Sequence, residues 1–312
     1  MFAVRRIVKI VPSYYLALAA TFVSAALLHI DVPVAFTLAT HLLFAQNSIT
    51  SPLGQANSVF WSLGTEVQFY LVFPLLARAF VRRPIFVALA SLAIALAFRY
   101  GVAGCCLTNE PINRQLPAYL DVFAAGMCAA YGIAVVEKRF AGRSALDVFA
   151  TLATIVCFAG AVWLAIGASN VTYVAAGRER WLLLDRTFVA VAIGIALVGT
   201  TFAVPIARRV FVNPVALFLS KISYNFYLWH ALVLIWILKS GTLSAATANP
   251  YDDPRWKAAY IAVGWSVSLA IATALTYFFE RPILATIKPQ NFAFPWHRVI
   301  RASAASSSET GT

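Results

Sequence analysis

Residues Ser58–Leu76 read SVFWSLGTEVQFYLVFPLL, an apolar run with the length of a membrane helix that nevertheless carries a carboxylate, Glu66. Polar and aromatic neighbours surround this residue, among them Ser62 and Gln68. A carboxylate at membrane depth is costly, so an ionisable residue inside a span usually faces the bundle interior or a wet cavity and indicates function. The run therefore predicts a membrane helix with a chemical task.

The composition of the whole chain supports a membrane protein. Of its 312 residues, 61% are hydrophobic and 12% are charged, with a mean hydropathy of +0.79. Soluble domains carry about 25% charged residues. Several stretches of about twenty residues are nearly free of charge, which is the length that crosses a bilayer as a helix. The short alternating strands of a membrane barrel do not occur. We therefore predict an all-α, polytopic bundle of transmembrane helices.

The apolar stretches define about eight spans and one shorter segment. The spans are expected at about 12–30, 59–80, 84–104, 117–136, 146–168, 185–204, 216–239 and 258–280. Residues Pro33–Asn47 are too few to cross comfortably and predict a re-entrant or interfacial helix. Residues 1–290 are expected to form one membrane domain, followed by a small, polar and partly disordered tail over 291–312.

The positive charge follows the membrane topology rather than a nucleic-acid surface. The net charge is +12, but the 24 Lys and Arg residues lie in short clusters between the spans. Such clusters mark cytoplasmic loops, so the pattern predicts no nucleic-acid partner and places the C-terminus in the cytoplasm. In this topology three ionisable residues from separate spans lie at a similar depth towards the outer face, namely Glu66, Arg99 and Asp121. They either serve function or form a network that pins helices together.

Three motifs resemble acyltransferase family 3, the integral-membrane acyltransferases of bacteria. The run FWSLGTEVQFYLVFPLL resembles the family's W-S-L-x-x-E-x-Q-F-Y-x-x-x-P-L-L signature. The segment RRIVKIVPSYYLAL resembles its R-R-x-x-R-I-x-P segment, with Lys9 in place of the second arginine of the R-x-x-R pair. The endings ISYNFYLWHALVL and TYFFERPIL resemble its S-Y-x-x-Y-L-x-H and E-R-P motifs. The agreement runs in order over nearly the whole chain.

One departure from the family pattern lies at the start of the chain. Family members usually begin with two further spans, which carry a histidine regarded as the catalytic base and an F-F-x-x-S-G-F-like run. This chain starts four residues before Arg5 and contains neither. The resemblance therefore implies a member that lacks its N-terminal pair of spans.

The resemblance implies transfer of an acyl group, often acetyl, from acyl-CoA to a hydroxyl group. Acyl-CoA would be a co-substrate, and no bound cofactor or metal is expected. The CoA head is polyanionic, and the cluster Arg5, Arg6 and Lys9 can pair with its phosphates. The same cluster is also explained by positive-inside anchoring alone.

The acceptor hydroxyl needs a base within hydrogen-bonding reach. Two catalytic candidates are Glu66, which would orient or stabilise the base or bind sugar hydroxyls, and His230, which would replace the missing histidine or fix helix packing. Ser62, Glu66 and Tyr70 share one helix face, which suits a carbohydrate better than lipid. The residues expected to bind substrate are Trp61, Ser62, Tyr70, Arg99, Asp121 and Tyr227.

The expected location is a bacterial inner membrane, with lipid, acyl-CoA and a carbohydrate or glycolipid acceptor as partners. Two other functions stay open: a catalytically inactive, truncated relative, and a transporter or flippase-like protein. The absence of a detectable internal repeat argues against the transporter. The sequence leaves the acyl chain, the acceptor and the oligomeric state undetermined.

Overall fold

A computed structural model describes residues 2–49, 53, 57–106, 110–140, 144–171, 179–247 and 249–285. Within these ranges the regular structure is entirely helical, which confirms the predicted all-α class. The predicted tail over 291–312 lies outside the described residues.

Eight helices are long. They are α1 (Phe2–Leu27), α3 (Trp61–Arg82), α4 (Pro84–Cys106), α6 (Leu120–Phe140), α7 (Ser144–Val171), α9 (Arg186–Phe202), α11 (Pro214–Lys239) and α12 (Pro254–Leu275). Shorter helical elements join or extend them. These are α2 (Val34–Leu42), η1 (Gln46–Ser48), α5 (Glu110–Asn113), η3 (Leu116–Tyr119), η4 (Trp181–Asp185), α10 (Pro205–Phe211), η5 (Pro250–Asp252), η6 (Thr276–Glu280) and α13 (Arg281–Ala285).

Seven of the long helices in the described part of the chain are apolar enough to cross a membrane. The eighth, α3, has 22 residues and therefore the required length of about 33 Å at 1.5 Å per residue. Its polar side chains, including Glu66 and Gln68, lower its hydropathy below that of the other seven. A helix with this composition must turn its polar face towards protein.

The first helix begins earlier than the sequence predicts. The expected span starts at about residue 12, whereas α1 starts at Phe2 and contains Pro12 in its interior. Proline is tolerated within membrane helices because neighbouring groups and local adjustments satisfy the freed backbone carbonyl. As a consequence Arg6 and Lys9 lie on the helix itself, not in a segment that precedes it.

Two later helices have starts that their local sequence explains. The Asn213 side chain accepts a hydrogen bond from the Ala216 amide at 2.9 Å, and Asp253 caps α12 by accepting from the amides of Arg255 and Trp256. A proline follows each cap, at the first helical position, where its missing N–H costs nothing. Each cap satisfies amides that the helix leaves without partners.

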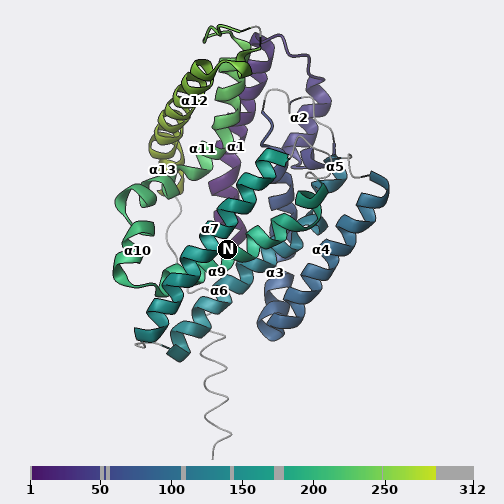
Figure 1. Ribbon diagram of the computed structural model, residues 1–312. Coiled ribbons are helices and arrows are strands. Elements are labelled where there is room, and N and C mark those ends of the chain that lie inside the picture. Colours follow the sequence, from purple (N-terminus) through teal and green to yellow (C-terminus); the bar gives the residue numbers. More distant parts are fainter. Residues whose placement is uncertain are drawn as a thin grey trace, which may run out of the picture.

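The helices form two groups with α3 between them (Figure 1). In one group α9 packs against α6 and α7, and α4 packs against α6. In the other, α11 packs against α12 and α1. A buried cluster that includes Tyr14 of α1, Phe60, Leu63 of α3 and Leu228 of α11 joins α3 to the second group. The motif-bearing helices α1, α3 and α11 therefore share one core.

Candidate functional site

A pair of hydroxyl groups joins α3 to α11. Ser62 Oγ lies 2.6 Å from Tyr227 Oη, and both hydroxyls also reach the Val59 carbonyl oxygen, at 3.0 and 3.2 Å. The two residues come from different motifs of the sequence, 165 positions apart. The structure thus brings together two of the residues that the sequence proposes for substrate binding.

The carboxylate of Glu66 lies one helical turn beyond Ser62 on α3. The Tyr70 hydroxyl donates a hydrogen bond to Glu66 Oε1, and the Arg6 guanidinium of α1 stands over the Tyr70 ring with its carbon 5.3 Å from the ring centroid. An arginine expected to hold acyl-CoA therefore meets the ring bonded to the expected catalytic carboxylate. Arg5 is also part of α1, but its side chain lies outside the described residues.

A second group of polar contacts joins α11 to α1 and the last helix. Tyr224 Oη donates to the Ile10 carbonyl at 2.8 Å, and Asn225 Nδ2 donates to Glu280 Oε2 at 2.7 Å. Lys9, the third residue proposed for acyl-CoA, attracts Glu280 electrostatically. The sequence analysis did not single out Tyr224 or Asn225, although both lie inside the quoted ISYNFYLWHALVL motif.

The imidazole of His230 lies one turn beyond Tyr227 on α11. Its Nδ1 lies 2.9 Å from the Tyr227 carbonyl oxygen and 3.2 Å from that of Phe226. A carbonyl only accepts, so Nδ1 is the donor, and in the neutral imidazole Nε2 then carries the lone pair. His230 and Tyr227 line a cavity of about 310 Å³ together with Phe226 and Trp265. The histidine has both the tautomer and the open space that a base needs.

The carboxylate and the imidazole each lie one helical turn from a member of the hydroxyl pair. Glu66 follows Ser62 on α3, and His230 follows Tyr227 on α11. The Ser62–Tyr227 contact therefore joins the helix that carries the carboxylate to the helix that carries the imidazole. Glu66 itself does not line the cavity at His230.

Arg99 and Asp121 form a separate network. Arg99 Nη2 lies 2.5 Å from Asp121 Oδ1, and Arg99 Nη1 donates to Thr187 Oγ1 at 2.8 Å. Thr187 in turn donates to Asp121 Oδ2, and the remaining Arg99 bonds go to the carbonyls of Ala118 and Leu183. Arg99 is 2% exposed. This satisfied ion pair ties α4 to α6 and α9, while Glu66 contacts Tyr70 instead. Their proposed role in substrate binding stays a prediction.

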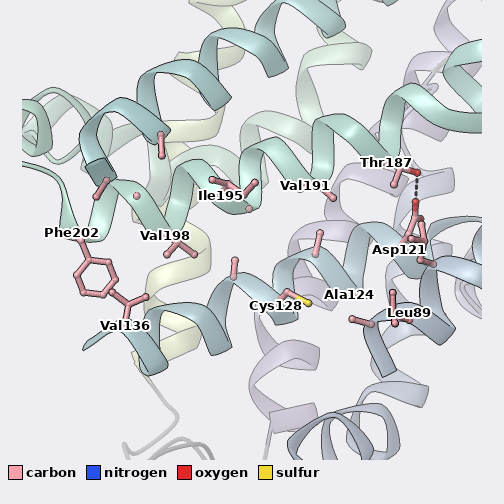
Figure 2. Close-up of a pocket in the computed structure, with 18 of the residues that line it drawn as sticks. Leu89, Asp121, Ala124, Cys128, Val136, Thr187, Val191, Ile195, Val198 and Phe202 are labelled. Carbon is pink, nitrogen blue, oxygen red and sulfur yellow. Dashed lines mark hydrogen bonds between the residues drawn. The ribbon is translucent and has the colours of Figure 1, made fainter. Parts of the chain in front are cut away.

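The Arg99–Asp121 network lies at one end of a cavity of about 490 Å³ between α4, α6, α7 and α9. Figure 2 shows Thr187 hydrogen-bonded to Asp121 at one end and Phe202 with Val136 at the other. Its walls between these ends are apolar and rich in alanine and glycine. The cavity suits a hydrophobic group and does not include Glu66 or His230.

Trp61 belongs to a row of rings and cations at the start of α3. Its ring lies 5.9 Å from that of Tyr119, and the Arg114 guanidinium stands 5.2 Å from the Trp61 centroid. On the far side, the Arg186 guanidinium stands 4.4 Å from the Tyr119 centroid. Alternating aromatic faces and cations of this kind suit a polar, ring-shaped ligand.

The motif glutamine, Gln68, is structural. Its Oε1 accepts from the Leu116 amide at 2.9 Å, and its Nε2 donates to Gln115 Oε1 at 2.9 Å. One turn earlier Thr65 Oγ1 donates to the Arg114 carbonyl at 2.5 Å. These bonds attach α3 to the loop before α6 and so fix the rotation that turns Ser62 and Glu66 towards α11 and α1.

Known proteins resemble this chain in sequence. A family model described as an acyltransferase domain matches residues 1–281. A protein of Acidianus two-tailed virus, named "Putative acetyltransferase ORF330", is 25% identical over 257 residues, which cover 79% of this chain and 70% of that protein. No solved structure matches the chain. The family model spans most of the sequence, and the helices have the length and apolarity of membrane spans, so this chain is an integral membrane protein of the acyltransferase 3 family.

Proposed function

We propose that the protein transfers an acyl group, acetyl in the first instance, from acyl-CoA to a hydroxyl group of a carbohydrate or related envelope or secreted molecule. The observation that carries the proposal is the contact of Ser62 with Tyr227, which joins the helices that carry Glu66 and His230. The two hydroxyls can hydrogen-bond a sugar, and a nearby imidazole or carboxylate can take up the proton of the sugar hydroxyl that reacts. The proposed location is a bacterial inner membrane with the C-terminus in the cytoplasm.

The cations of α1 are assigned to the donor. Arg6 stands over Tyr70, and Lys9 lies on the same helix close to Glu280. Together with Arg5 they can pair with the phosphates of CoA, which places the thioester on the Glu66 side of the hydroxyl pair.

The reaction then balances as a simple acyl transfer. His230 Nε2 removes the proton of the acceptor hydroxyl as its oxygen attacks the thioester carbonyl, and a C–O bond forms. The C–S bond breaks, and the proton returns from His230 to the CoA thiolate. The hydroxyls of Ser62 and Tyr227 can donate to the developing oxyanion, a contribution that grows in the transition state.

The test uses the full chain purified in detergent with radiolabelled acetyl-CoA. We expect acetyl-CoA consumption that falls at least about 100-fold in His230→Gln, because general acid–base groups contribute about 10²–10⁴ in rate. It should also fall in Glu66→Gln, because the carboxylate that would stabilise the base or bind the sugar hydroxyls is then lost. Matched controls are Glu137→Gln and His29→Asn, which change exposed residues and should retain activity. Full activity of both site variants would contradict the proposal, and so would solute uptake by proteoliposomes without acetyl-CoA consumption.

A further inference from the structure

The start of α9 contains a buried cation with donors that stay unpartnered. Arg186 is 6% exposed, yet its Nε and Nη2 have no hydrogen-bond partner among the described residues. Burying guanidinium donors without partners is unfavourable, so such a group normally has a ligand or a further partner.

The two aspartates near Arg186 are each contacted directly by another arginine. Asp121 is engaged by Arg99 at 2.5 Å, and the sequence neighbour Asp185 is engaged by Arg180 at 3.1 Å. Arg186 is attracted by Asp121 and repelled by Arg99. The two buried guanidiniums of Arg99 and Arg186 therefore share the charge of Asp121, and Arg99 holds its carboxylate directly.

The position of Arg186 relates it to the hydroxyl pair. Its guanidinium stacks on Tyr119, whose ring lies 5.9 Å from that of Trp61, and Trp61 directly precedes Ser62 on α3. Arg186 therefore contacts Tyr119, and Tyr119 contacts Trp61 at the start of α3, the helix that carries Ser62. The π-helical turn η4, immediately before Arg186, interrupts the regular helix, and such turns are frequent at functional sites.

We propose that Arg186 binds an oxyanion, a carboxylate or phosphate carried by the acceptor, so that the acceptor is an acidic sugar or sugar phosphate. A guanidinium has the planar fork that matches either group with two parallel hydrogen bonds. The aromatic side chains of Tyr119 and Trp61 lie beside this cation, and their remaining apolar surface can contact a sugar ring. The oxyanion site at Arg186 does not depend on the proposed function. The assignment of the oxyanion to the acceptor of the acyl group rests on it.

Thermal unfolding of the full chain in detergent tests the binding without any acyl donor. Glucuronate and glucose 6-phosphate distinguish a carboxylate from a phosphate, glucose is the neutral control, and sodium chloride keeps the ionic strength constant. We expect at least one acidic sugar to raise the unfolding midpoint, because a ligand of the native state stabilises it by mass action, and glucose not to do so. Equal shifts with acidic and neutral sugars, or no shift with any of them, would refute the proposal.

The variant Arg186→Gln separates binding from a structural role. We expect binding at least about tenfold weaker, because hydrogen bonds to charged groups are strong, while the ligand-free variant is no less stable than the natural chain. Arg209→Gln is the matched control, because Arg209 is an exposed arginine of α10 and the variant should keep the shift. An Arg186→Gln variant that keeps the shift, or that is destabilised without ligand, would show that Arg186 does not serve as an anion site.

Turnover measured in parallel distinguishes the two proposals. Binding of an acidic sugar without acetyl transfer would contradict the proposed function and leave the anion site standing. Acetyl transfer that is equally fast to glucose and glucuronate would contradict the anion site and leave the proposed function standing.

Discussion

Ser62 of α3 and Tyr227 of α11 share a hydrogen bond of 2.6 Å across the interface between these two helices. The bond depends on how the two helices pack, because it joins positions 165 residues apart. The contact therefore reports directly whether the signature motif and the S-Y-x-x-Y-L-x-H motif are assembled into one site.

The first prediction concerns this contact. Ser62→Ala and Tyr227→Phe should each lower the free energy of unfolding by about 1 kcal/mol, the usual net value of a hydrogen bond. The double variant should lose less than the sum of the two single losses, because both changes remove the shared bond, while each hydroxyl also gives up its own bond to the Val59 carbonyl. Urea unfolding followed by tryptophan fluorescence measures the cycle. Ser223→Ala is the control, since its hydroxyl bonds only within its own helix. Fully additive losses would contradict the contact.

The second prediction concerns the buried ion pair. Asp121→Ala should lower the free energy of unfolding by about 3–5 kcal/mol, because it leaves the Arg99 charge buried without its partner. The double variant Arg99→Met/Asp121→Leu should recover much of this loss, since neither charge is then buried. Unfolding curves of the three proteins under one set of conditions provide the measurement. A double variant less stable than Asp121→Ala would show that the pair itself stabilises the bundle.

The third prediction concerns the packing of α9 on α7. A methyl group at Gly199 would lie 2.7 Å from the Ala150 carbonyl oxygen, whereas at Gly160 it would meet nothing within 4 Å. Gly199→Ala should therefore cost about 1–3 kcal/mol by overpacking. Gly160→Ala should raise stability by about 0.5–1 kcal/mol, because alanine loses less conformational freedom in a helix. A higher thermal unfolding midpoint for Gly199→Ala than for Gly160→Ala would argue against this contact between α9 and α7.

The fourth prediction concerns pH and His41 on the short helix α2. His41 is 1% exposed, and the Tyr14 hydroxyl lies 2.8 Å from its Nδ1. Burial lowers the pKa of His41 to about 4, from an ordinary value of about 6.5. Its contribution to stability is therefore complete above about pH 6.5 and is lost as pH falls towards 4, on the order of 3 kcal/mol in total.

The measurement is the unfolding midpoint between pH 7 and pH 4. The natural chain should lose stability over this window, and His41→Gln should lose less. His29→Asn, a change at an exposed histidine, should follow the natural chain. An unchanged acid dependence in His41→Gln would contradict the prediction.

The membrane class and the motif-bearing helices could be predicted from the sequence, because each depends on a local property. A run such as 84–104 is long and apolar enough to cross the bilayer wherever it lies in the bundle. The face shared by Ser62, Glu66 and Tyr70 follows from helical periodicity alone. The start of α1 could not be placed, because Pro12 weakens the local signal and neighbouring helices compensate for it.

The sequence by itself determined an all-α membrane protein and the residue types that its site contains, because hydrocarbon requires helices and a buried charge requires a use. Only the tertiary structure decided the partners. It joined Arg99 to Asp121, placed Arg6 over Tyr70 beside Glu66, and left two donors of Arg186 without a hydrogen-bond partner among the described residues. The physical reason is that periodicity fixes which residues share a helix face, while the packing of whole helices fixes which faces meet.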